Sequence, residues 1–189
     1  MMRIAVLFIL IFLVPQLQGC FPLAAGGAVG GAIMASDRRT SGAYVEDQEI
    51  EIKAASRIGE KLGDSVHVNV TSFNRNVLLT GEAPSAEAKK QVEESVRGVL
   101  NVRGISNEVA IAGNSSFASR TNDAYLTSKI KARYIDANKF QALYVKVVTE
   151  DGVAYLLGLV THQEADDAVE ITRTTSGVRK VVKIFEYLD

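Results

Sequence analysis

The fold of this chain is decided by the stretch Val77-Leu78-Leu79-Thr80-Gly81-Glu82-Ala83, which recurs 77 residues later as Ala154-Tyr155-Leu156-Leu157-Gly158-Leu159-Val160. In both places an alternating strand pattern precedes the apolar stretch, and a charged helical pattern follows it. A Gly-Val pair, Gly98-Val99 or Gly177-Val178, and a last segment rich in Val and Ile complete each copy. Self-similarity at a fixed period of this size indicates a duplicated module. We therefore predict two small, related domains in tandem.

The pattern within each copy predicts the order helix, strand, strand, helix, strand. In the first copy, apolar residues at every fourth position predict a helix over 47–62. A tight turn at Asn74-Arg75 joins strands 65–72 and 76–83 into a hairpin. A helix from Pro84-Ser85 to Gly98 leads to a strand over 104–111, and this crossover favours a parallel pairing. The fold class is thus α+β, with two tandem αββαβ domains, each a three-stranded mixed sheet with two helices on one face.

The second copy follows the same order. Its predicted elements are a helix over 122–138, strands over 143–149 and 153–160, a helix over 163–175 and a strand over 179–187. Thr161 and Glu164 form a capping box at the start of the second of these helices.

Length and composition are those of an ordinary globular protein. The 189 residues are 47% hydrophobic and 23% charged, and the formal net charge is −1. The chain has no basic tract, which excludes a typical nucleic-acid binder. Acidic residues outnumber basic ones over 44–113 but not over 120–189. The second domain is therefore the less acidic of the two.

The N-terminus has the pattern of an export signal. Arg3 precedes an apolar run over 4–14, which is too short to span a membrane. Leu17-Gln18-Gly19-Cys20 then resembles the bacterial lipobox, although Gln18 replaces the usual small residue. Cys20, the only cysteine, would receive the lipid, and Phe21 after it resembles the default sorting to the outer membrane. The alternative is a chance cysteine behind an apolar start.

These observations divide the chain into five segments. We predict a lipoprotein signal peptide over 1–19, a lipidated Cys20 with a flexible tether rich in Gly and Ala over 20–43, a first domain over 44–112, a linker over 113–121 and a second domain over 122–189.

Candidate catalytic chemistry is absent from the sequence pattern. His67 and His162 lack a second residue at metal-ligand or triad spacing, and we interpret both as solvated surface residues. No phosphate-binding glycine loop or nucleophile elbow follows a strand. We expect no enzyme, no cofactor and no metal. Gly81 and Gly158 fall at equivalent strand positions, where glycine permits a bulge or a close backbone approach.

The first helix of the second domain is the candidate functional element. On a helical wheel Tyr125 points away from the core, beside Ser128, Lys129, Ala132 and Asp136, and Lys131 and Arg133 flank it. An exposed aromatic ring next to basic residues is how a helix addresses an anionic membrane interface. The alternative is an ordinary surface tyrosine that packs on the neighbouring domain. The candidate phospholipid-binding residues are Tyr125, Leu126, Ser128, Lys129, Ala132 and Arg133, although Leu126 and Arg133 also fall on the core-facing side.

Together, the repeat, the paired glycines and the lipobox resemble the BON-domain family, and specifically the dual-BON-domain outer-membrane lipoproteins of the DolP/YraP type. The likeness is strongest over 122–129, 145–152 and 158–161. It implies a lipid-anchored protein on the periplasmic face of a Gram-negative outer membrane. Its second domain would bind anionic phospholipids, such as phosphatidylglycerol and cardiolipin, through its first helix. The lipid-contacting aromatic would be Tyr125, where the family can have Trp.

The resemblance further implies a part in envelope integrity, enrichment at the division site, and no catalytic residues. The competing hypothesis is a protein adaptor that acts in outer-membrane protein assembly or in septal cell-wall remodelling. It requires an envelope-assembly or division protein as partner.

Overall fold

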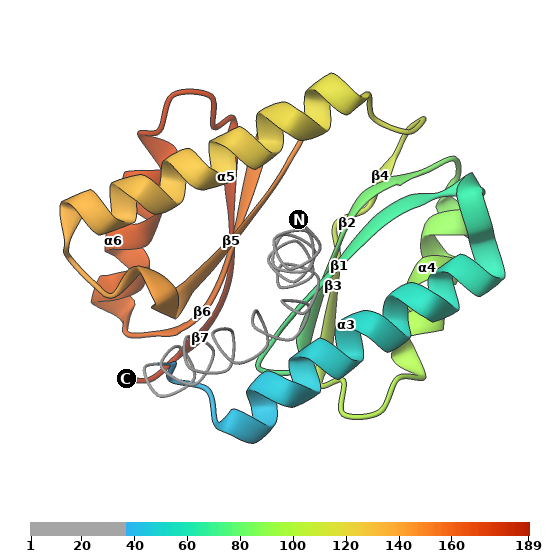
Figure 1. Cartoon of the computed structure of the whole chain (residues 1–189), viewed down its shortest axis with the longest axis horizontal. Helices are drawn as coiled ribbons and strands as arrows, with labels where there is room; N and C mark the ends of the chain where they lie inside the picture. The colour runs from blue at the N-terminus through green and yellow to red at the C-terminus, as the bar shows by residue number, and fades with distance from the viewer. Residues whose placement is uncertain (1–36) are drawn as a thin grey trace, which may run out of the picture. The chain divides into compact units, whose positions relative to one another are not determined.

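The computed structural model describes residues 37–189, and in this part of the chain both repeats follow the predicted order of elements (Figure 1). The predicted signal peptide, Cys20 and most of the tether lie outside the described residues. The elements are α3 (Ser41–Leu62), η2 (Gly63–Ser65), β1 (His67–Phe73), β2 (Asn76–Ala83), α4 (Ala86–Arg97), β3 (Gly104–Asn107), β4 (Ala110–Ile111), α5 (Phe117–Ala137), η3 (Ala142–Tyr144), β5 (Val145–Glu150), β6 (Val153–Val160), α6 (His162–Arg173) and β7 (Lys180–Tyr187).

The first sheet is mixed and has four strands rather than the predicted three. β1 and β2 form an antiparallel hairpin whose turn residues, Asn74 and Arg75, both have positive φ angles, as a type I′ turn requires. β3 and β4 both pair in parallel with β2. The predicted third strand over 104–111 is therefore interrupted, because Glu108 and Val109 leave the ladder while Val109 enters the core.

The second sheet has the predicted three strands, in the order β5-β6-β7. β5 and β6 are antiparallel and are joined by a turn at Asp151 and Gly152, both with positive φ. β7 pairs in parallel with β6 over its whole length, from Val153 opposite Lys180 to Val160 opposite Tyr187. The crossover through α6 thus gives the parallel pairing that the sequence predicted.

Two helices begin earlier than predicted. α3 begins at Ser41, where the Thr40 side chain accepts a hydrogen bond from the Ala43 backbone N–H. α5 begins at Phe117, capped in the same way by Ser116. The tether therefore ends before residue 41, and the second half of the predicted linker 113–121 is helical. The apolar periodicity does not reach the first turn of α5 because that helix buries its first residue only at Asp123, whereas α3 already buries Ala43 in its first turn.

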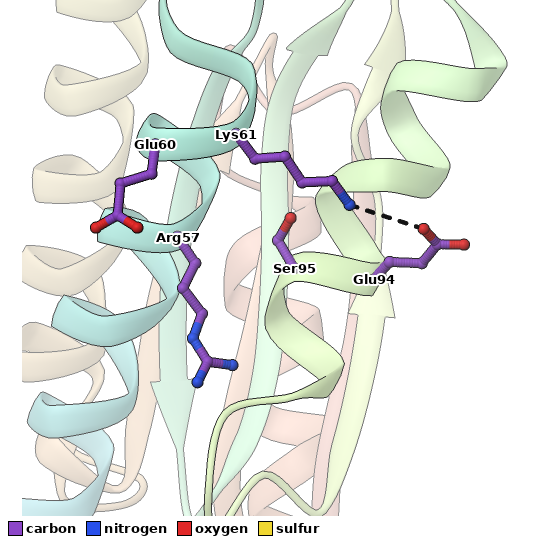
Figure 2. Close-up of a pocket in the computed structure, with 5 residues that line it drawn as sticks. All are labelled: Arg57, Glu60, Lys61, Glu94 and Ser95. Carbon is purple, nitrogen blue, oxygen red and sulfur yellow. Dashed lines mark ion pairs between the residues drawn. The ribbon is translucent and has the colours of Figure 1, made fainter.

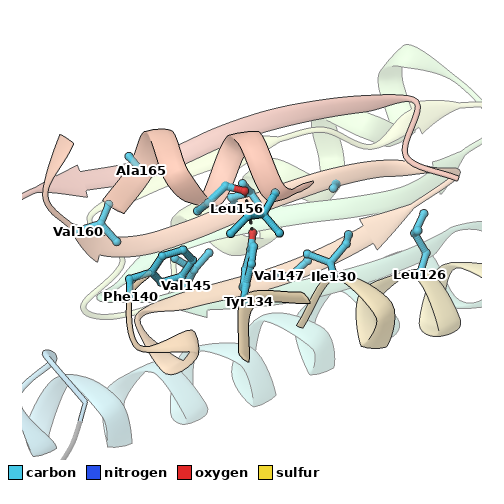
Figure 3. Packing of buried hydrophobic residues seen from close by; sticks show 12 residues of the cluster. Leu126, Ile130, Tyr134, Phe140, Val145, Val147, Leu156, Val160 and Ala165 are labelled. Carbon is cyan, nitrogen blue, oxygen red and sulfur yellow. Dashed lines mark hydrogen bonds between the residues drawn. The ribbon is translucent and has the colours of Figure 1, made fainter. Parts of the chain in front are cut away.

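Each domain has a core between its helices and one face of its sheet. α3 and α4 lie side by side on the same face of the first sheet (Figures 1 and 2). In the second domain, Leu126, Ile130 and Tyr134 of α5 pack against the sheet (Figure 3). The sheet faces without helices meet in a third cluster, which includes Phe73, Leu78, Tyr155 and Leu157. The two domains of residues 38–189 therefore share apolar contacts within one compact unit.

Both repeated glycines lie where a neighbouring strand comes close. A Cβ atom at Gly158 would lie 2.5 Å from the carbonyl oxygen of Tyr144, which no real side chain tolerates. A Cβ at Gly81 would collide with the carbonyl oxygen of His67, and Gly81 also has a φ of 108°. A side chain at either position would therefore force the hairpin strands apart.

Candidate functional site

The inner face of α5 fixes the helix on the second sheet. Leu126 is 2% exposed, and Ile130 and Tyr134 are fully buried. The Tyr134 hydroxyl lies 2.6 Å from Thr172 Oγ1 on α6, and burial raises the pKa of Tyr134 to about 12. Leu126 is therefore a core residue, and its assignment to the phospholipid site is wrong. A side chain that fills the core cannot reach a lipid surface.

A buried aspartate attaches the N-terminal half of α5 to the β5–β6 turn. Asp123 is 5% exposed, and its carboxylate accepts hydrogen bonds from the backbone N–H groups of Asp151 and Gly152, each at 2.9 Å. Asp47 on α3 does the same for Asn74 and Arg75 in the first domain. The sequence carried a signal for this pair, because the two aspartates occupy equivalent places in the repeat.

Two basic residues of α5 bind the C-terminal end of α6. Arg133 Nη1 donates to the Ile171 carbonyl and to Thr175 Oγ1, both at 2.6 Å. Lys129 Nζ donates to the Ser176 carbonyl at 3.0 Å. Cations near the last carbonyls of a helix stabilise its C-terminal end. The structure therefore corrects the assignment of Arg133, whose guanidinium caps a helix instead of facing lipid, and gives Lys129 a similar attachment.

The outer face of α5 is apolar and open to solvent. Tyr125 is 65% exposed, and the candidate residues Ser128 and Ala132 are exposed beside it. Phe117 and Ile135 are also exposed, by 79% and 68%. At about 100° per residue, the three large side chains fall within one face of the helix, and at 1.5 Å per residue they span roughly 27 Å. The alternative that Tyr125 packs on the first domain is wrong.

Phe117 and Ile135 are missing from the sequence-based site for different reasons. Phe117 lies in the segment predicted as linker, so it was left off the helical wheel. Ile135 lies within the predicted helix but is not one of the residues assigned to the site. The sequence does contain the information needed to find them. When the helix begins at Phe117, Phe117 and Ile135 fall on the same side of the helix as Ser128.

Basic charge accompanies this apolar face. Lys131 is exposed, and within residues 37–189 its ammonium has no ion-pair partner. The corresponding helix of the first domain, α3, exposes Ile52 but also carries Glu49, which pairs with Lys53, and Glu60. The outer face of α5 is thus apolar and carries both Lys131 and the exposed Asp136, whereas the outer face of α3 is mixed and carries more acidic residues.

The histidines lie apart from this helix face. His67 is half-buried, with Nδ1 3.0 Å from Glu82 Oε2, so its interpretation as a solvated residue needs correction. His162 is exposed, stacks on Tyr187 and contacts Asp189. Within residues 37–189, no group of three His, Cys, Asp or Glu side chains could hold a metal ion. In the same part of the chain, no helix is long and apolar enough to cross a membrane.

Comparison with known proteins finds the same duplication. The sequence profile of the BON domain matches residues 47–113 and 122–189. The outer membrane lipoprotein DolP of Haemophilus influenzae is 35% identical over 175 residues, which cover 92% of this chain and 91% of that protein. The 21 kDa hemolysin of Actinobacillus pleuropneumoniae is 30% identical over 80% of this chain and 79% of its own length. The osmotically-inducible protein Y of Escherichia coli is 30% identical over 74% of this chain and 72% of its own length.

Proposed function

The chain belongs to the BON-domain family as a dual-BON envelope protein of the DolP type, and from this membership and the outer face of α5 we propose that it is an outer-membrane lipoprotein that binds anionic phospholipid. Cys20 carries the lipid anchor, and the second domain faces the membrane from the periplasmic side. In this role the protein supports envelope integrity and acts at the division site. It uses binding surfaces and no catalytic residue.

One observation carries the proposal: three large apolar side chains lie on the outer face of one helix, and at its edge is a lysine that has no ion-pair partner within residues 37–189. Transfer of a Phe, Ile or Tyr side chain from water into the interface stabilises the bound state by up to about 1.5–3 kcal/mol each. A lysine near an anionic surface adds about 1 kcal/mol. A helix that lies flat in the interface uses such a face. The acyl chain and the helix then act as two weak signals that together give stable attachment.

Vesicle sedimentation tests this proposal. The unacylated chain from residue 20 on, carrying Cys20→Ser, is mixed with vesicles of phosphatidylglycerol or of phosphatidylcholine. We expect binding to the anionic vesicles only, and a loss of about tenfold or more in the variant Tyr125→Ala, Lys131→Glu, since each lost contact contributes about 1 kcal/mol or more. The variant Ile52→Ala, Lys53→Glu makes the matched change on α3 and should bind like the unchanged protein. Equal binding by both variants would reject α5 as the lipid site.

A second candidate function is a protein adaptor in outer-membrane protein assembly or septal cell-wall remodelling. The observation that favours it is a groove between α3 and α4 of the first domain that contains Arg57, an arginine without a hydrogen-bond or ion-pair partner within residues 37–189. In cells, this function predicts a specific protein crosslink to the first domain that persists in the Tyr125→Ala, Lys131→Glu variant. Loss of the crosslink together with lipid binding would contradict an independent adaptor role.

A further inference from the structure

The duplicated fold allows each basic residue of one domain to be compared with its equivalent in the other. Asp47 and Asp123 fasten equivalent turns, and Ser85 and Thr161 cap equivalent helices, α4 and α6. Both pairs are separated by 76 residues. At the same separation, Arg57 on α3 corresponds to Arg133 on α5. The two arginines therefore occupy the same place in their domains, over the C-terminal end of the second helix.

The two arginines differ in their partners. The guanidinium of Arg133 is held by the Ile171 carbonyl and by the hydroxyls of Thr174 and Thr175. At this separation the positions equivalent to these two threonines are Gly98 and Val99, which offer no hydroxyl. The sequence-based pairing of Gly98-Val99 with Gly177-Val178 is therefore wrong by three residues, because Gly177 and Val178 correspond to Asn101 and Val102.

Arg57 keeps its place over the helix end without these acceptors. Its Nη1 lies 2.9 Å from where a Cβ atom of Gly98 would be. Within residues 37–189, however, the guanidinium of Arg57 makes no hydrogen bond or ion pair. The first domain thus has the arginine but lacks the groups that satisfy it in the second.

A shallow cavity of about 400 Å³ lies at this arginine, between α3 and α4 (Figure 2). Lys61, one turn after Arg57, reaches across the groove toward Glu94 on α4, with its Nζ 3.9 Å from the carboxylate. Glu60 points away from α4. The Ser95 hydroxyl already donates to the Gln91 carbonyl. The groove is therefore lined by two cations and two carboxylates, of which Lys61 and Glu94 face each other, and within residues 37–189 Arg57 is the cation without a partner.

We propose that this groove binds the side-chain carboxylate of an Asp or Glu in a protein partner. A guanidinium presents a planar fork of donors that matches the two oxygens of a carboxylate. A phosphate dianion fits less well, because Glu94 and the negative end of the α4 dipole lie beside the site. Leu100, two residues beyond Gly98 in the chain, is 75% exposed and is the large apolar side chain available to a partner after this helix end. The partner is thus a segment in which an acidic residue stands next to an apolar one. The proposal deepens the adaptor function and does not depend on lipid binding by α5.

Nuclear magnetic resonance on the unacylated chain carrying Cys20→Ser tests the proposal directly. The probe is the peptide acetyl-Gly-Glu-Leu-Gly-amide, and the readout is the side-chain Nε–Hε signal of Arg57. We expect a saturable shift of this signal and of the backbone signals over 95–100. The Nε–Hε signal of Arg133 is an internal control and should stay unchanged, because its acceptors are already in place. The twin peptide with Gln for Glu should bind about tenfold more weakly, because hydrogen bonds to a charged acceptor are roughly twice as strong.

Two variants at position 98 test whether the missing hydroxyl is what allows Arg57 to bind the peptide. Gly98→Thr restores the hydroxyl found at the equivalent place in the second domain, so it should satisfy Arg57 internally and abolish the shift. Gly98→Ala adds only the Cβ, which the flexible guanidinium can avoid, and should retain the response. Because Gly98 has a φ of −84°, both residues fit the backbone. If Gly98→Thr responds like the unchanged protein, a missing acceptor is not what opens the site.

Other ligands give distinguishable outcomes. A stronger shift with inorganic phosphate than with the Glu peptide would show a general anion site and overturn the proposal. Broadening of the Arg57 signal by phosphatidylglycerol vesicles, without a peptide response, would mark a membrane-facing groove and also overturn it. An unshifted Arg57 with the peptide would reject the site while leaving the vesicle result for α5 untouched.

Discussion

Replacement of Asp123 by Ala tests how α5 is held in place. The carboxylate accepts two backbone N–H groups of the β5–β6 turn, and alanine accepts neither. Gly152 is buried, so its N–H would lose its partner without access to water, whereas the exposed Asp151 can be solvated. A buried donor left unpaired costs about 1–3 kcal/mol, and the lost charge-assisted bond adds about 1 kcal/mol. We expect the free energy of unfolding to fall by roughly 2–4 kcal/mol.

The equivalent variant of the first domain, Asp47→Ala, allows the losses of unfolding free energy in the two domains to be compared. Asp47 accepts the N–H groups of Asn74 and Arg75, the Ser72 hydroxyl at 2.6 Å and the Arg39 guanidinium at 2.8 Å. Removal of one partner from a buried ion pair costs about 3–5 kcal/mol. Asp47→Ala should therefore destabilise the protein more than Asp123→Ala.

Calorimetry and hydrogen exchange together measure the effect of the Asp123 variant. Calorimetry reports the global loss, and exchange of the amides over 117–127 reports whether the N-terminal half of α5 has loosened. Asp123→Asn, which retains one acceptor oxygen, should give an intermediate loss. An unfolding free energy for Asp123→Ala within about 0.5 kcal/mol of the unchanged protein, the range of ordinary surface changes, would refute this account of the turn.

Two further predictions follow from the strand contact and from the ion pair at α6. Gly158→Val should destabilise the second domain by about 3 kcal/mol or more, because its Cβ would lie 2.5 Å from the Tyr144 carbonyl; an unchanged melting temperature would contradict this. The hydrogen bond from Arg38 lowers the pKa of Glu164 below its ordinary 4.5, so the stability that it contributes is complete above pH 4.5 and is lost as the pH falls through the lowered pKa. Arg38→Ala should therefore be less stable than the unchanged protein at pH 7, and the difference should shrink on acidification; a pH-independent difference would refute the linkage.

The fold was predictable because both repeats express the same pattern. Alternation gave the hairpins, Asn74-Arg75 and Asp151-Gly152 gave the tight turns, and the crossover rule gave the parallel last strand. The start of α5 was not predictable from apolar periodicity, because its first turn buries no residue. The predicted start of α3 was also too late, although its first turn buries Ala43. The caps Thr40 and Ser116 held the missing information. The last strand of the first domain is divided into β3 and β4, whereas the last strand of the second domain, β7, is continuous. Comparison of the two repeats therefore could not predict this interruption.

The candidate site was predicted only in part. The wheel placed Tyr125, Ser128 and Ala132 outward, and the structure finds all three exposed. It could not show that Arg133 caps α6, because that contact joins residues 38 apart in sequence. Phe117 was hidden by the misplaced helix start. The sequence pattern thus identifies the residue types on the helix face, but it does not determine which side chains bind each other or where the helix begins.

The most direct test of membrane docking by α5 is a residue-by-residue map of lipid-induced chemical shifts. The unacylated chain carrying Cys20→Ser is titrated with phosphatidylglycerol bicelles, with phosphatidylcholine bicelles as reference. The account predicts the largest changes at Phe117, Tyr125 and Ile135, smaller ones at the intervening outward positions, and little change on α3. Changes centred on α3, or an unperturbed α5 in the anionic bicelles, would contradict it.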